Sequence, residues 1–310
     1  MNILGPLIQF LRDTLPRVRN IRTRIWLGWL SLINRYGRAP VTQPDGPVLS
    51  LTTYGMRIRT VYLTIESIAR GRQRPSEFIL WLDDENAFNS LPPTLQRLKA
   101  RGLTIRLTKN YGPHKKYYPY VESQGAFIVP LVTADDDILY PPSWLKGLVD
   151  GFRASPEVIH CYRARVITFD HTGLTKYTGW ELCTATCASF CHFATGVSGV
   201  LYPPSFLNVL KNAGNAFETC CPKADDVWLH VQALRAGFKI RQISAEPLHF
   251  KPIPGTQSAA LHLRNVTDDN GNDRQIKATY TQTDIETLRC EFAEHQRSQL
   301  TSANPIAFSD

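Results

Sequence analysis

Strand-like and helix-like segments alternate between residues 47 and 107, and this alternation constrains the fold more than any other feature of the sequence. Apolar runs predict strands over Pro47–Tyr54, Glu77–Leu82 and Leu103–Leu107. Helices are predicted between them, over Val61–Arg70 and Thr94–Arg101. This order is typical of a parallel sheet covered on both faces. The sequence therefore predicts an α/β fold with a mostly parallel central sheet flanked by helices, and a site at the carboxyl ends of the strands.

Three consecutive acids follow the next apolar segment. A helix predicted over Val121–Phe127 leads into the apolar run 127–133, which ends at Asp135, Asp136 and Asp137. A strand that delivers carboxylates to its carboxyl end is how an α/β protein presents oxygen ligands to Mg²⁺ or Mn²⁺. A solvated acidic turn is the alternative, because aspartate is common in turns. The triplet alone supports both interpretations equally.

Two pairs of charged residues flank this triplet in the sequence. Lys115 and Lys116 lie in a loop rich in tyrosine and proline, where they could bind phosphate as point charges. An ordinary surface loop is the alternative. Asp225 and Asp226 begin an apolar helix that stops at Gly237. One acid there can serve as an N-cap, which leaves the other for chemistry.

Three further residues are weaker candidates. His249 lies among apolar residues and is a candidate third ligand for an Asp-bound cation, although a lone histidine is more often structural. Gly196 and Gly199 bracket a turn, where small residues let a ligand approach the backbone. Packing of these glycines against a neighbouring helix is the alternative.

The positive charge of the chain is concentrated at its N-terminal end. Residues 1–38 hold one acid, Asp13, and account for +6 of the net charge of +8. They hold seven arginines: Arg12, Arg17, Arg19, Arg22, Arg24, Arg35 and Arg38. The nearly uncharged run 25–33 is too short for a bilayer span, which needs about 20 residues. This arm is expected either to lie on an anionic membrane surface or to pack on its own domain or a partner subunit.

The cysteine count bears on the cellular compartment. Seven cysteines, an odd number in a chain of 310 residues, fit free thiols in a reducing compartment better than a disulfide framework. The expected location is therefore the cytoplasm, with peripheral attachment to the inner face of the cell membrane through residues 1–38.

Taken in order, these segments resemble a glycosyltransferase of the GT-A fold, similar to the family 2 and related bacterial enzymes that use nucleotide sugars. The resemblance covers about residues 47–250. It is carried by Leu49–Tyr54, Lys115-Lys116, Thr133–Pro141, Gly196–Pro204 and Ala224–Trp228. It implies a metal-dependent inverting transfer of a sugar from a nucleotide-diphosphate donor, a UDP-sugar, to a glycan or lipid-linked acceptor in bacterial surface polysaccharide synthesis. No nucleic acid polymer is expected as a partner.

The resemblance also implies roles for individual residues. Asp135, Asp137 and His249 would hold Mn²⁺ or Mg²⁺, and Asp226, or else Asp225, would be the general base. Trp180, Gly196 and Gly199 would lie on the acceptor side. The residues expected to bind the donor are Thr52, Thr53, Tyr54, Arg59, Asp83, Asp84, Lys115, Lys116, Asp135 and Asp136.

The expected domain layout is a basic arm and linker (1–46), a catalytic domain (47–280) and a C-terminal helix and tail (281–310). The catalytic domain would have a nucleotide-sugar half (47–142) and an acceptor half (143–280). One alternative function is a nucleotidyltransferase, although its usual glycine-rich Arg-Lys signature after the first strand matches Gly55–Arg59 poorly. The other is a non-catalytic glycan-binding protein on the same fold.

Overall fold

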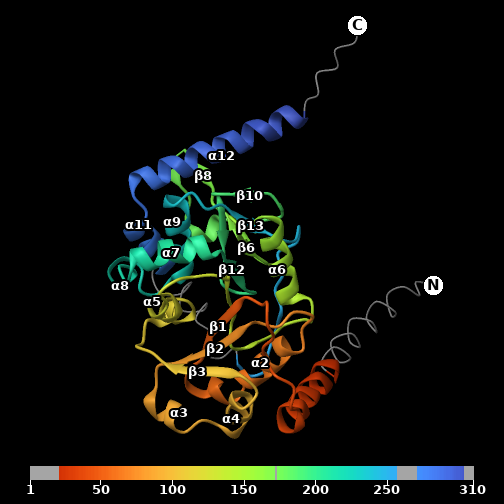
Figure 1. The fold of residues 1–310 in the computed structure, drawn as a ribbon. Helices are drawn as coiled ribbons and strands as arrows, with labels where there is room; N and C mark the ends of the chain where they lie inside the picture. The colour runs from red at the N-terminus through yellow and green to blue at the C-terminus, as the bar shows by residue number, and fades with distance from the viewer. Residues whose placement is uncertain (1–20, 172, 257–270, 304–310) are drawn as a thin grey trace, which may run out of the picture.

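A central sheet organises the chain (Figure 1). The computed structural model describes residues 21–171, 173–256 and 271–303. Within these ranges the sheet has eight strands in the order β10-β13-β6-β12-β4-β1-β2-β3. They are β1 (Val48–Thr52), β2 (Glu77–Leu82), β3 (Leu103–Leu107), β4 (Leu131–Thr133), β6 (Ile159–Cys161), β10 (Ala188–Ser189), β12 (Val200–Tyr202) and β13 (Ile240–Gln242). Only β12 and β10 run antiparallel to their neighbours, so the predicted mostly parallel α/β sheet is confirmed.

Helices cover both faces of the sheet. They are α2 (Val61–Ala69), α3 (Glu85–Asn89), α4 (Pro93–Lys99), α5 (Tyr118–Ser123), α6 (Trp144–Ala154), α7 (Pro204–Ala213), α8 (Phe217–Cys220), α9 (Asp225–Arg235), α11 (Gly271–Thr279) and α12 (Gln282–Ala303). Figure 1 shows α5, α7 and α9 on one side of the sheet and α2 and α6 on the other. Successive residues of a strand point to opposite faces, so Leu49 joins the core under α2 and α6, and Val48 the core under α5 and α7.

The predicted ends of the strands agree best with the structure where a single apolar run forms the whole strand. Strands β2 and β3 begin and end where the sequence predicts them. The helix predicted over Val121–Phe127 was wrong in position, because α5 spans Tyr118–Ser123. Pro119 lies in its first turn, a favoured place for proline, and Gln124 has an extended backbone that ends it.

Three small two-stranded sheets accompany the central sheet in the described part of the chain. They pair β5 (Ile138–Leu139) with β14 (Lys251–Pro252), β7 (Ala164–Val166) with β11 (His192–Ala194), and β8 (Phe169–Asp170) with β9 (Gly173–Leu174). The β5–β14 pairing is the one that shapes the site, because it brings residues 251–256 beside the aspartate triplet. The backbone N–H of Ile253 donates to the carbonyl of Asp137 at 2.7 Å.

A helix over residues 21–36 packs on the body of the protein. Its Leu30 is fully buried against Leu63, Leu139 and Ile253. Its Asn34 is also buried and donates to Glu66 Oε1 at 3.2 Å. Residues 1–20, which include Arg12, Arg17 and Arg19, lie outside the described residues.

The end of the expected arm and linker (1–46) also contacts the body. Val41 is fully buried, and its N–H donates to the carbonyl of Arg101 at 2.9 Å. The N–H of Gln43 donates to the carbonyl of Pro75 at 2.8 Å. This segment therefore follows the edge of the domain.

All seven cysteines are free, as predicted. Cys161, Cys183, Cys191 and Cys221 are buried. Burial raises the pKa of Cys191 to about 12 and that of Cys221 to about 12, which keeps both thiols protonated. These two cysteines therefore act as small core residues.

Candidate functional site

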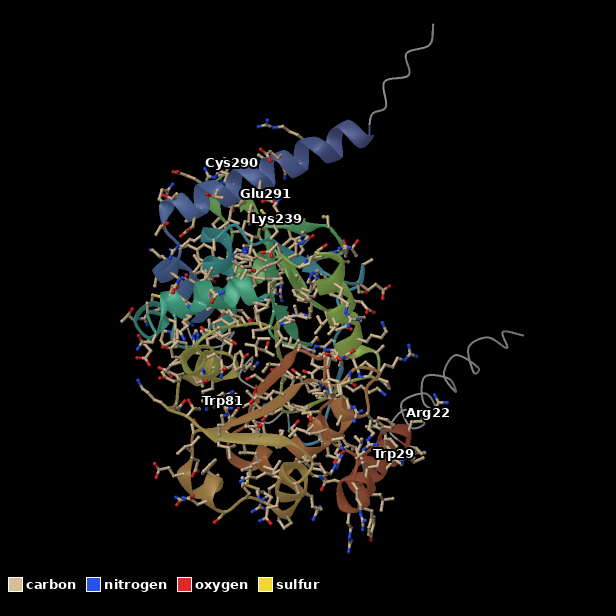
Figure 2. The ribbon with its side chains drawn as sticks, viewed as in Figure 1. Arg22, Trp29, Trp81, Lys239, Cys290 and Glu291 are labelled. Carbon is tan, nitrogen blue, oxygen red and sulfur yellow. The ribbon has the colours of Figure 1, made fainter. Side chains whose placement is uncertain are left out.

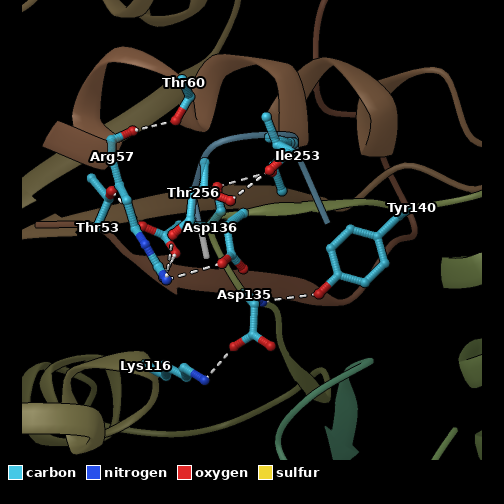
Figure 3. Close-up of polar contacts among 11 residues, drawn as sticks. Thr53, Arg57, Thr60, Lys116, Asp135, Asp136, Tyr140, Ile253 and Thr256 are labelled. Atoms are coloured by element: carbon cyan, nitrogen blue, oxygen red, sulfur yellow. Dashed lines mark hydrogen bonds and ion pairs between the residues drawn. The ribbon is translucent and has the colours of Figure 1, made fainter. Parts of the chain in front are cut away.

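The order of the strands reverses between β1 and β4. From β1 the chain proceeds to β2 and β3 on one side, and β4 then lies on the other side of β1. Open α/β sheets bind ligands outside the carboxyl ends of the strands at such a switch point. Here the segment after β1 carries Thr53 and Arg57, and the segment after β4 carries the aspartate triplet. Figure 3 shows these two segments in direct contact.

Arg57 joins the two segments. It lies in a short 3-10 turn, η1 (Gly55–Arg59). Its guanidinium lies 2.9 Å from Asp136 Oδ1 and 3.0 Å from Asp137 Oδ2. Thr53 Oγ1 donates to Asp136 Oδ2 at 2.6 Å. Asp136 and Asp137 are both buried, so the solvated-turn interpretation of the triplet is wrong.

Burial perturbs the acidity of this triplet. It raises the pKa of Asp137 to about 6, and the nearby Asp135 adds to this shift whereas Arg57 opposes it. Burial also raises the pKa of Asp136, against Thr53 and Arg57. Raised values mean that ionising either carboxyl costs free energy, which is typical of a functional site.

This cost predicts how stability depends on pH. A carboxyl whose folded-state pKa is raised contributes stability below its unfolded value, near 4, and loses it as pH rises through about 6. Asp137→Asn removes the cost of ionisation. We therefore expect it to raise the free energy of unfolding at pH 7 relative to pH 4 by up to about 3 kcal/mol, measured by urea denaturation at both pH values. The same difference in Asp150→Asn, which changes an exposed carboxylate, would contradict this assignment.

Two lysines approach the same edge from the 3-10 turn η2 (Gly112–Lys116). Lys115 Nζ lies 2.5 Å from Asp83 Oδ2, at the end of β2, and Lys116 pairs with Asp135. Burial by itself lowers the pKa of Lys116, but Asp135 and the Asp225-Asp226 pair raise it further than burial lowers it. Lys116 is therefore a permanent cation. The loop is fixed to β1 by Ser50, whose Oγ donates to the carbonyl of Lys116 at 2.6 Å.

His114 holds this lysine loop in place, a role that the sequence did not reveal. Its ring stacks on Phe217 with centroids 3.9 Å apart. Its two nitrogens lie 2.9 Å from the Tyr117 hydroxyl and 2.8 Å from the Cys221 carbonyl. Burial lowers the pKa of His114, so the ring is neutral and positions the loop.

Asp226 also acts on Lys116 through its charge. It is not an N-cap: Ala224 occupies that position, and both acids lie in the first turn of α9. Asp226 Oδ1 instead accepts from the N–H of Gly196 at 2.9 Å. A side-chain carbon on Gly196 would lie 3.0 Å from Asp226 Oδ1 and 3.7 Å from Lys116 Nζ. The missing side chain at Gly196 therefore leaves room for both charged groups beside the backbone at this position.

The pKa of Asp226 is raised well above its ordinary range. Burial is the main cause and Asp225 adds to it, whereas Lys116 and the Gly196 N–H oppose it. A carboxylate with a raised pKa is a stronger base once it is ionised. Of the two acids, Asp226 is the one that accepts from the Gly196 N–H.

Other predicted donor-site residues have different surroundings. Thr52 Oγ1 donates to the carbonyl of Trp81 at 3.1 Å, and Asp84 caps α3 by accepting from the N–H of Ala87 at 3.1 Å. Tyr54 and Arg59 are exposed at the rim. The Arg57 guanidinium lies over the ring of Tyr54, 5.4 Å from its centroid.

Two of the three predicted acceptor residues are packed in the core. Trp180 is 1% exposed and contacts Phe193 edge-on. Gly199 has a φ of +95°, and a side-chain carbon there would lie 2.5 Å from the ring of Trp144. Gly199 therefore packs against α6, as the alternative interpretation held, and only Gly196 faces the site.

The predicted metal ligands are not assembled into a site. Asp135 and Asp137 are paired with Lys116 and Arg57, and His249 is exposed. Across 21–171, 173–256 and 271–303, no group of three or more histidine, cysteine or acidic residues is placed to hold a metal ion. The predicted three-ligand arrangement therefore does not fit the structure. Because Mg²⁺ often binds one or two carboxylates together with substrate phosphates, metal dependence stays a prediction.

No protein-family model matches the chain, and no curated protein matches it. Solved structures do match, at low identity. A CMP:2-keto-3-deoxy-manno-octonic acid synthetase complexed with CTP is 14% identical, with a TM-score of 0.38 over 64% of this chain and 88% of that one. An inositol-1-phosphate CTP transferase from T. maritima is 11% identical, with a TM-score of 0.41 over 68% and 91%. A 4-diphosphocytidyl-2C-methyl-D-erythritol synthase from Anaerococcus prevotii DSM 20548 is 11% identical, with a TM-score of 0.41 over 81% and 99%.

These comparisons correct the prediction of a glycosyltransferase. All three are named as enzymes of cytidine nucleotides, in line with the alternative of a nucleotidyltransferase, and none is named as a glycosyltransferase. The correction also removes the details that depended on a glycosyltransferase. These are the polysaccharide pathway, the inverting chemistry and the glycan or lipid-linked acceptor. TM-scores near 0.4 do not assign an activity, so the function has to be argued from the site itself.

Proposed function

We propose that this protein is a nucleotide-dependent transferase, and specifically a nucleotidyltransferase. The observation that carries the proposal is the meeting of Arg57, Lys115 and Lys116 with the carboxylates after β2 and β4 at the switch point of the sheet. Three cations at one edge suit the phosphates of a nucleoside triphosphate, which bears several negative charges. Nucleotidyltransferases usually carry a basic signature after the first strand, which Gly55–Arg59 matches poorly. Arg57 supplies a basic group at this place in the fold.

The chemistry follows from where the charges lie. An acceptor oxygen attacks the α-phosphorus, and the bond from this phosphorus to the bridging oxygen of the β-phosphate breaks, so that pyrophosphate leaves. Lys115 and Lys116 stabilise the charge that develops on pyrophosphate. Asp226, when ionised, accepts the proton of the attacking hydroxyl. Activity should therefore rise with pH through the raised pKa of Asp226.

Turnover of labelled triphosphates tests this proposal. The protein is incubated with each of the four ribonucleoside triphosphates, labelled at the α-phosphate, and with a panel of hydroxyl and phosphate-monoester acceptors. We expect one triphosphate to yield pyrophosphate together with a labelled product. A protein that binds triphosphates but yields no pyrophosphate with any acceptor would be a binding protein, and the proposed activity would be wrong.

A further inference from the structure

The helix over residues 21–36 exposes an apolar stripe that nothing in the chain covers within the described ranges. Its five members are between 41% and 68% exposed: Ile21, Ile25, Trp29, Leu32 and Tyr36. At about 100° per residue they fall within an arc of about 80° on the helix surface. Trp29 also stacks on Trp26, with centroids 4.8 Å apart, which holds its ring at the edge of the stripe.

The opposite face of this helix packs against the body of the protein. Trp26, Leu27 and Leu30 pack on the body, and Asn34 is buried against Glu66. On the helix surface these residues centre about 150° away from the stripe. The stripe therefore points away from the domain, and Figure 2 shows Arg22 and Trp29 at the periphery of the molecule. Its apolar side chains are not needed for the packing of the helix.

The charges beside the stripe have one sign. Arg22 flanks it on one side and Arg24 and Arg35 on the other, and all three are exposed. Between residues 21 and 44 there is no aspartate or glutamate. In the described part of the chain, no helix is long and apolar enough to cross a bilayer. A short helix with an apolar face flanked by arginines is suited to lie in the plane of a membrane interface.

We propose that residues 21–36 bind the protein to the surface of a bilayer that contains anionic lipid. Ile25, Trp29 and Leu32 insert among the acyl chains near the headgroups, and the flanking arginines contact lipid phosphates. The opposite face stays on the domain, so the helix attaches without unfolding. This inference does not depend on the reaction that the protein catalyses.

A second copy of the chain fits the stripe less well. Two such helices placed face to face would bring their arginines together, and the helix carries no acid to compensate them. Like charges across an interface oppose association. An anionic membrane satisfies the apolar and the basic part of the surface at once.

Vesicle sedimentation with the full chain tests the proposal. We expect binding to phosphatidylcholine vesicles with about 30 mol% phosphatidylglycerol to exceed binding to phosphatidylcholine alone by at least about tenfold. Raising the salt from about 0.1 M to about 1 M should weaken it, because the Debye length falls from about 10 Å to about 3 Å.

Two variants separate the contributions of the stripe and of the charges. Ile25→Ser/Leu32→Ser and Arg22→Gln/Arg24→Gln/Arg35→Gln should each lower vesicle binding by about tenfold or more. Ile128→Ser is the matched control, because Ile128 is 90% exposed elsewhere on the protein. Thermal unfolding should be unchanged in all three, since every substituted side chain is exposed.

Three outcomes would overturn the proposal. They are equal binding to both kinds of vesicle, no binding to either, and wild-type binding by the Ile25→Ser/Leu32→Ser variant. Light scattering on the same samples tests the other explanation, that the stripe binds a second copy of the chain. A dimer that this variant abolishes, without vesicle binding by the wild type, would assign the stripe to a second copy of the chain.

Discussion

Arg101→Met is expected to lower the free energy of unfolding by about 3 to 5 kcal/mol, the typical cost of breaking a buried ion pair. Arg101 binds Glu66 through two hydrogen bonds, of 2.5 and 3.1 Å. The Glu66 side chain is fully buried and that of Arg101 is 5% exposed. After the substitution the carboxylate keeps the hydrogen bond from Asn34, at 3.2 Å, but has lost its cation. Urea denaturation at pH 7 measures the loss.

Two further variants show whether burial of the ion pair is the reason for the large loss of stability. Arg106→Met breaks the Arg106–Glu77 pair, whose side chains are 37% and 33% exposed, and should cost less than about 1 kcal/mol. The double variant Arg101→Met/Glu66→Leu should recover most of the loss, because no buried charge is left unpaired. Equal costs for Arg101→Met and Arg106→Met would contradict this account of the pair.

Asp226→Asn is expected to lower turnover by about 10² to 10⁴, the usual contribution of a general base, and to leave triphosphate affinity unchanged. The amide keeps the shape of the side chain and can still accept from the Gly196 N–H. It cannot take a proton from the acceptor. The pyrophosphate assay gives turnover, and calorimetry gives affinity.

The neighbouring acid provides the comparison. Asp225→Asn should reduce turnover much less, because of the two acids it is the carboxylate of Asp226 that the Gly196 N–H holds in position. Asp150→Asn, at an exposed carboxylate, should have no effect. Full activity in Asp226→Asn together with a large loss in Asp225→Asn would exchange the roles of the two acids.

Much of the fold and part of the site could be predicted from local patterns. The bounds of β2 and β3 follow from apolar runs, and the triplet at Asp135–Asp137 follows from the run that ends there. Lys115 and Lys116 stood out because two lysines are unusual in an aromatic loop, and they do meet the carboxylates of neighbouring strands.

The remaining errors concern contacts between distant segments. Arg59 was predicted at the site, yet Arg57 binds the triplet and Arg59 is exposed, because which side of the η1 turn faces β4 depends on tertiary packing. Trp180 was expected to line the acceptor side and is a core residue instead. A strand that ends in aspartates is common to several nucleotide-using α/β enzymes, so the triplet does not distinguish sugar transfer from nucleotidyl transfer.

This edge of the sheet is proposed to bind nucleotides through their phosphates, and calorimetry tests this claim most directly. The titrants are the nucleoside, its monophosphate and its triphosphate, added to the wild type, to Lys116→Met and to the exposed-lysine control Lys146→Met. We predict that affinity increases with each phosphate and that Lys116→Met lowers triphosphate affinity by about tenfold or more, because a charge-assisted contact is lost, whereas Lys146→Met changes nothing. Equal affinity for nucleoside and triphosphate, or wild-type affinity in Lys116→Met, would contradict the claim.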